Sequence, residues 1–203
     1  MQIRLIPSLL ALAVAGALST PTLAADKKVP EGGKSVLTAG GLKGVRLHAG
    51  PDDGKYGEHT IIDVKEQPFK QAIRSKVKLR PTDVWNVQLS TLLAEPVKAG
   101  DVVLISFWAR TIESKNYGGK GAFNVYFGTP ETDLEVTASH ELTIGDKWTL
   151  VQIPATVAAS YEAGKGMLNL DLGNDPQTLE FAEIKLLNFG NKVKESELPS
   201  TGH

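Results

Sequence analysis

The stretch GDVVLISFWART, from Gly100 to Thr111, alternates apolar and polar side chains along its length. Successive side chains of a β-strand point to opposite faces, so this pattern predicts a strand with two chemically different faces. One face is apolar and suits the core of an antiparallel sandwich; it consists of Val103, Ile105, Phe107 and Ala109. The opposite face carries Ser106, Trp108 and Arg110. A hydroxyl, an indole and a guanidinium are groups that a sugar-binding surface uses, although plain solvent exposure explains them as well.

Similar short runs, rich in β-branched and aromatic residues, fill most of the chain and are separated by Gly-, Pro- and Asp-rich turns. The predicted strands are 60–64, 72–79, 85–90, 102–110, 122–127, 134–143, 148–153, 167–172 and 179–189. The Ala-rich segment 155–163 lacks an apolar stripe and predicts a loop or a single turn. Many short strands at this spacing predict an all-β fold with two antiparallel sheets packed as a β-sandwich.

Residues 1–24 predict a secretory signal peptide. Arg4 precedes an apolar run, and Thr22 and Ala24 are small residues spaced for cleavage. A retained N-terminal helix is the alternative. No later segment reaches the roughly 18 uninterrupted apolar residues of a membrane span. We therefore expect an exported protein, periplasmic or extracellular, with no membrane span.

The remaining chain predicts one domain of ordinary size. We expect a flexible leader over 25–36, a β-sandwich domain over 37–191 and a C-terminal tail over 192–203, because both ends are polar and one contains Pro199. The absence of cysteine excludes disulfides and thiolate metal sites. A formal net charge of −1 without a basic run argues against a nucleic-acid partner.

Strand alternation extends the polar face of the first stretch to other strands. Opposite their apolar sets, three further strands present Gln88, Asn124, Tyr126, Asn169 and Asp171. If these strands neighbour one another, the five residues share a surface with Trp108 and Arg110, where aromatic rings stack on sugars and planar polar groups pair with hydroxyls. The alternative is that Trp108 and Tyr126 are half-buried and that Arg110 forms a structural ion pair with Asp171. Trp85 and Trp148 open their strands and are expected in the core.

Several motifs recur in a familiar order: PFKQAIR (68–74), WNVQL (85–89), PVKAGDVVLISFWAR (96–110), DKWTLVQIP (146–154), LNLDLGNDPQTLEFAEIKLLNFG (168–190) and LP (198–199). The set resembles the carbohydrate-binding modules of β-jelly-roll, galactose-binding-like type that are appended to secreted bacterial endo-xylanases and other glycoside hydrolases. The resemblance implies a jelly roll that holds a polysaccharide, such as xylan or glucan, on its concave sheet or edge loops. The positions that match the family's Trp, Gln and Arg are Trp85, Gln88, Trp108 and Arg110. Related modules often carry structural calcium, for which Glu183 is the candidate ligand here, with Asp63 as a partner.

The residues support an enzymatic function less well than polysaccharide binding. No Gly-x-Ser-x-Gly pattern occurs. His48 and His59 flank a Gly-rich loop with Asp52 and Asp53 but form no metal-binding pair. Asp171 and Glu180 are the carboxylates that a glycosidase would need to pair across a cleft. We therefore expect a non-catalytic polysaccharide-binding protein without a required cofactor, which could act beside a separate glycoside hydrolase. An exported protein-binding or envelope-structural sandwich is the main alternative.

Overall fold

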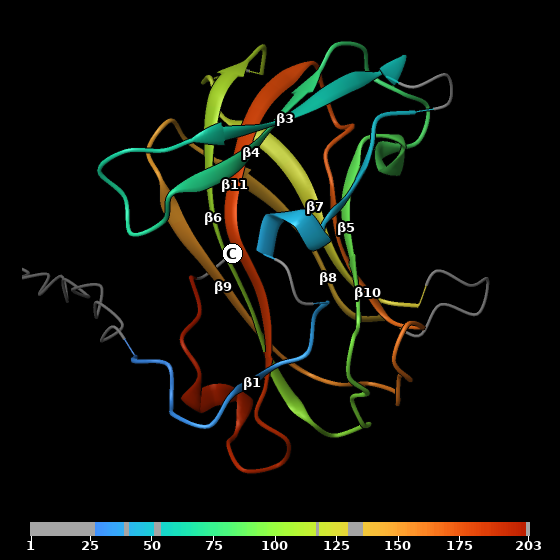
Figure 1. Cartoon of the computed structure of the whole chain (residues 1–203), viewed down its shortest axis with the longest axis vertical. Helices are drawn as coiled ribbons and strands as arrows, with labels where there is room; N and C mark the ends of the chain where they lie inside the picture. The colour runs from blue at the N-terminus through green and yellow to red at the C-terminus, as the bar shows by residue number, and fades with distance from the viewer. Residues whose placement is uncertain (1–26, 39–40, 51–53, 117, 130–135, 202–203) are drawn as a thin grey trace, which may run out of the picture.

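The computed structural model describes residues 27–38, 41–50, 54–116, 118–129 and 136–201, and these form a sandwich of two antiparallel sheets (Figure 1). The first sheet has the strand order β3 (Gly57–Asp63), β4 (Gln71–Val77), β11 (Gln177–Asn188), β6 (Val102–Ser114) and β9 (Thr149–Thr156), with β1 (Lys34–Ser35) paired to β11. The second sheet has the order β2 (Arg46–His48), β5 (Gln88–Leu92), β10 (Met167–Asp171), β7 (Gly121–Gly128) and β8 (Val136–Ile144). Short 3-10 helices are η1 (Gly41–Gly44), η2 (Val84–Asn86) and η3 (Glu195–Glu197). The predicted all-β sandwich is confirmed.

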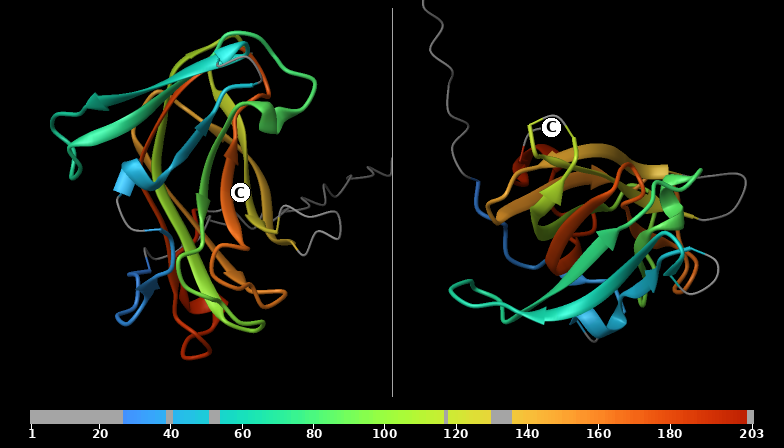
Figure 2. Two further views of the ribbon diagram at one scale, coloured as in Figure 1. Left: turned by 45° about the vertical axis from the view of Figure 1, so that its right-hand side comes forward. Right: turned by 90° about the horizontal axis from the view of Figure 1, so that it is seen from above.

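The core between the sheets is built from the apolar faces that the alternation predicts. On β6, Val103, Ile105, Phe107 and Ala109 are completely buried. The Phe123 ring of β7 packs against two rings of the first sheet, with centroids 6.0 Å from Phe107 and 5.1 Å from Phe181. Burial of each such side chain stabilises the fold by about 1.5–3 kcal/mol. The hairpin of β3 and β4 extends past the body of the sandwich (Figure 2).

One predicted segment differs from the structure, and another agrees with it. The strand expected over 85–90 begins only at Gln88, because Val84–Asn86 form η2, with the Asn86 N–H donating to Asp83 O and the Val87 N–H to Val84 O. The Ala-rich segment continues β9 to Thr156 and then runs without a helix to Tyr161, which forms an isolated bridge with Val97. The expectation of a loop there is confirmed.

The ends of the described chain, which belong to the leader and tail expected over 25–36 and 192–203, are packed against the first sheet. Ser35 pairs with Leu187 of β11. Leu198 is 1% exposed and belongs to a small cluster with Val102, Leu104 and Phe189. The Lys27 Nζ donates to Ser196 O at 2.6 Å, which joins the two ends. The predicted signal peptide, 1–24, lies outside the described residues. Within the described part of the chain, no helix has the length and apolar character needed to cross a membrane.

Candidate functional site

The outward face of the second sheet carries two rows of side chains that run across all of its strands. Cross-strand pairing defines the first row as His48, Gln88, Asp171, Asn124 and Glu141. It defines the second row as Arg46, Ser90, Asn169, Tyr126 and Ser139. Neighbouring strands lie 4.7–4.9 Å apart, so each row is about 19 Å long. The sheet therefore presents a polar band perpendicular to its strands.

A hollow of about 680 Å³ lies over this band. Its lining includes Gln88, Asn124, Tyr126, Asn169 and Asp171, the five expected site residues on β5, β7 and β10. These strands are neighbours, so the condition under which the five residues share one surface is met. The lining also contains Val84 and Trp85 from η2, together with His48, Thr129, Ser139 and Met167. We call this feature the Trp85 hollow.

Trp85 was expected in the core, and that expectation is wrong. The residue is 54% exposed. Its turn is tied to the end of β10, since the Gly173 N–H donates to Val84 O at 2.9 Å. A Cβ on Gly173 would lie 2.6 Å from Val84 O, so only glycine allows this close approach. The sequence signal that could have revealed η2 is the turn Pro81-Thr82-Asp83, directly before Trp85.

Hydrogen bonds fix several polar groups of the Trp85 hollow. The Gln88 Nε2 donates to Asp171 Oδ1 at 2.7 Å, and the Tyr126 hydroxyl donates to Thr129 O at 2.7 Å. The Oδ1 atoms of Asn124 and Asn169 are buried and accept no hydrogen bond from the described residues. Three amides, a carboxylate and a phenol therefore line one surface with acceptor capacity left over.

Burial raises the pKa of Asp171, and the hydrogen bond from Gln88 opposes that rise only in part. Burial also raises the pKa of Tyr126, with smaller contributions from Tyr161 and Asp171. A higher pKa keeps the Tyr126 phenol neutral over the physiological range. Its hydroxyl oxygen can therefore still accept a hydrogen bond while its proton is held by Thr129 O.

Trp108 and Arg110 lie on the other sheet, so the expectation that all seven residues share one surface is wrong. β6 pairs with β11 and β9, and its polar side chains point outward from the first sheet. The Trp108 ring centroid is 5.8 Å from that of Phe69. The Arg110 guanidinium lies 4.7 Å from the ring centroid of Trp148, which is half-buried in this outer cluster rather than in the main core.

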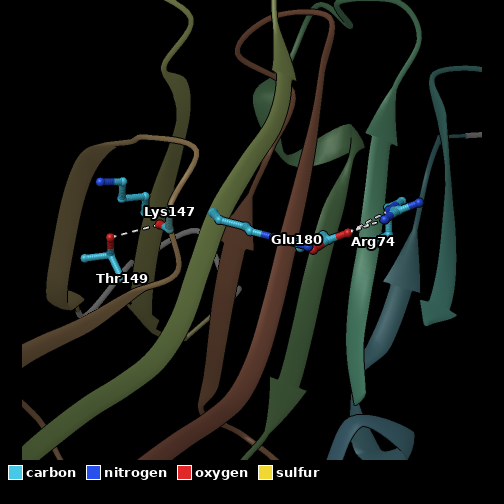
Figure 3. Close-up of polar contacts among 5 residues, drawn as sticks. Arg74, Lys147, Thr149 and Glu180 are labelled. Atoms are coloured by element: carbon cyan, nitrogen blue, oxygen red, sulfur yellow. Dashed lines mark hydrogen bonds and ion pairs between the residues drawn. The ribbon is translucent and has the colours of Figure 1, made fainter. Parts of the chain in front are cut away.

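Glu180 is the ion-pair partner of Arg110, in place of the Asp171 considered from the sequence. Its side chain is completely buried; it accepts from Arg110 Nε at 2.6 Å and from Arg74 Nε at 2.8 Å. Figure 3 shows Glu180 of β11 pointing to Arg74 of the adjacent β4. Asp171 lies on the second sheet, so the two carboxylates do not face each other across a cleft as a glycosidase pair does.

The residues considered for metal binding are engaged elsewhere. Glu183 forms an ion pair with Lys185 at 2.5 Å, and Asp63 accepts a hydrogen bond from Gln71 at 3.4 Å. Both ring nitrogens of His59 are hydrogen-bonded, to Ser75 Oγ and to His48 O. The described residues contain no group of three or more His, Asp or Glu side chains that could hold a metal ion. Asp52 and Asp53 lie outside the described residues. Structural calcium at Glu183 stays a prediction.

The expected resemblance to β-jelly-roll carbohydrate-binding modules is confirmed for the fold, because solved structures of such modules match this two-sheet sandwich. A solved structure of CBM4 matches with a TM-score of 0.53 and 14% identity over 74% of this chain and 90% of that chain. A putative sugar-binding protein from Bacteroides thetaiotaomicron matches with a TM-score of 0.52 and 14% identity over 70% of this chain and 86% of that chain.

An arabinose-bound GH51 α-L-arabinofuranosidase also matches, with a TM-score of 0.53 and 15% identity. The match covers 76% of this chain but only 25% of the arabinofuranosidase. No protein-family model and no curated protein sequence matches the chain. At sequence identities this low, the structural matches show a shared fold only.

Proposed function

We propose that this protein binds a polysaccharide in the Trp85 hollow without transforming it. The observation that carries the proposal is an exposed tryptophan beside two polar rows that cross five strands. Sugar rings have apolar faces that stack on indole and hydroxyls that pair with amides and carboxylates. The fold that the chain shares with solved carbohydrate-binding modules supports the same function.

The polysaccharide would lie along the rows, perpendicular to the strands. A band about 19 Å long accommodates several sugar units. Gln88 and Tyr126 are already held by Asp171 and Thr129, which lowers the entropy lost when they bind a ligand. Each stacked ring or hydrogen bond contributes about 1 kcal/mol net, so an oligosaccharide should bind with micromolar to millimolar Kd. We propose a β-glycan such as xylan or glucan as the ligand.

A binding role rather than catalysis is supported by the composition of the hollow. Asp171 is the one carboxylate among its described lining residues. Hydrolysis of a glycosidic bond generally needs two carboxyl groups on either side of the bond. We propose that the exported protein acts in the periplasm or outside the cell, where a separate glycoside hydrolase could share its polymer.

Native affinity electrophoresis through gels that contain xylan, mixed-linkage glucan, mannan, pectin or alginate tests the proposal, with sugar-release assays on the same polymers. We expect retardation in at least one neutral β-glycan without released sugar. Trp85→Ala should abolish most of the retardation and keep the melting temperature. Leu79→Ala is the matched control, since Leu79 is 57% exposed but does not line the hollow. Migration unaffected by every polymer, without product, would favour a protein-binding envelope role.

A further inference from the structure

The outward face of the first sheet contains a second hollow, of about 410 Å³, over β11, β6 and β9. We call it the Trp108 hollow; its lining includes Ser106, Trp108, Gln152, Glu183 and Lys185. It lies on the opposite side of the sandwich from the Trp85 hollow, because the two outward faces enclose the shared core. The proposed function does not use it.

Cross-strand pairing again arranges polar groups in a row beside an aromatic ring. Lys185, Ser106 and Gln152 pair across the three strands, and the adjacent row contains Trp108 between Ala182 and Leu150. The Trp108 side chain is half-buried: Phe69 supports it, and part of it lines the hollow. A supported indole next to polar side chains is a platform for one face of a sugar ring.

The polar groups next to Trp108 are available to a ligand. The side chains of Ser106 and Gln152 form no hydrogen bond with any described residue, although both are half-buried. A half-buried amide and hydroxyl without protein partners lose free energy unless water or a ligand satisfies them. They are therefore the pair of groups most suited to sugar hydroxyls in this hollow.

One wall of the hollow is held in a strained conformation. Glu183 has a φ of 52°, in the left-handed region that non-glycine residues rarely adopt, at an irregularity where the pairing of β11 with β6 shifts between Ala182 and Lys185. At this irregularity Glu183 and Lys185 form an ion pair in the lining. Their charges cancel, so the hollow favours neither a cation nor an anion.

From this arrangement we propose a second saccharide site in the Trp108 hollow, which takes one or two neutral sugar units and makes the protein bivalent. Trp108 stacks on the ring, while Ser106 and Gln152 bind its hydroxyls. The smaller volume, about 410 Å³ against about 680 Å³, fits a shorter ligand segment than the Trp85 hollow. A protein partner on the same face is the competing occupant.

The three tryptophans of the chain provide separate reporters for a test. Their indole N–H signals in NMR spectra can be assigned with Trp→Phe variants, and the intact protein is then titrated with xylohexaose and cellohexaose. We expect the Trp85 and Trp108 signals to move with one of these sugars, and the Trp108 signal to keep its midpoint in Trp85→Ala. Movement of Trp85 alone would overturn the second site and leave the proposed function standing. If both signals stay fixed and no polymer retards the protein, both proposals fail.

Gln152→Ala separates a ligand contact from a structural effect, because the Gln152 side chain has no partner among the described residues. The variant should raise the Trp108 midpoint about threefold to tenfold and leave the Trp85 midpoint unchanged. Gln88→Ala is the matched control at the other face and should give the reverse pattern. An unchanged Trp108 midpoint in Gln152→Ala would overturn the assignment of this residue and of the site built on it.

Discussion

At the scale of single residues, Asp171 lies in the proposed binding surface, and its buried carboxylate lowers the stability of the folded protein when it is ionised. It is 9% exposed, lies in the middle of the polar rows and has Gln88 as its hydrogen-bond donor. Its folded-state pKa is raised mainly by burial. The folded protein therefore holds this proton more tightly than the unfolded chain, and the ionised carboxylate lowers stability at neutral pH.

Replacing the Asp171 carboxylate with a neutral amide should reveal this loss of stability. In Asp171→Asn an acceptor oxygen for Gln88 remains, and the new amide can donate to the buried, unpartnered Oδ1 of the cross-strand neighbour Asn124. We expect the variant to melt at a higher temperature than wild type at neutral pH. The difference should shrink as the pH falls through the raised pKa and reach its minimum below about pH 3.5, where the unfolded Asp is also protonated. Thermal melts across this range measure it; a variant that is less stable at neutral pH contradicts the argument.

At the scale of elements, η2 decides whether the Trp85 hollow has its aromatic ring. Gly173→Ala would place a Cβ 2.6 Å from Val84 O and 2.7 Å from Pro81 Cγ, so η2 must move away from β10. We expect a loss of about 1–3 kcal/mol in unfolding free energy from overpacking, together with weaker retardation in polysaccharide gels. Denaturant unfolding and affinity electrophoresis measure the two effects.

Gly145→Ala is the control for this prediction, because a Cβ on Gly145 would meet nothing within 4 Å. It should bind polysaccharide as wild type does. Full binding by Gly173→Ala would show that the position of η2 is not needed for the hollow.

The alternation of side chains was sufficient to predict most strands but not the element that carries Trp85. Trp85, Val87 and Leu89 alternate as a strand would, and the structure buries Val87 and Leu89 as expected. Trp85 departs from the pattern because the backbone hydrogen bond from Val87 to Val84 closes a 3-10 turn. The local alternation of side chains does not reveal this turn of three residues. Its position depends on the hydrogen bond between Val84 and Gly173, which is distant in the sequence.

At the scale of the whole molecule, the sequence could not show which sheet each strand joins. β6 and β7 have the same alternation, yet β6 pairs with β11 and β9, while β7 pairs with β10 and β8. Strands that are far apart in the chain pair according to the packing of the complete core. The sequence pattern of a polar face is the same whichever sheet the strand joins. This is why alternation alone predicts a shared surface for Trp108, Arg110 and residues that lie on the opposite side of the sandwich.

The C-terminal segment is also a whole-molecule feature, since it covers apolar side chains on the outward face of the first sheet. Leu198 packs with Val102, Leu104 and Phe189. We expect Leu198→Ala to lower the free energy of unfolding by about 2–5 kcal/mol, as for other buried leucines. Leu79→Ala, at an exposed position, should change it by less than about 0.5 kcal/mol. Urea unfolding measures both, and equal small effects would mean that the segment is not part of the stable core.

The contact between Lys27 and Ser196 has a practical consequence for anyone who attaches the protein to a surface. It places both ends of the described chain beside the first sheet, and Val29 also lines the Trp108 hollow. A sensor chip linked near either end would leave the Trp85 hollow facing the solution but would crowd the Trp108 hollow. Immobilised and free protein should therefore report different numbers of sugar chains per molecule.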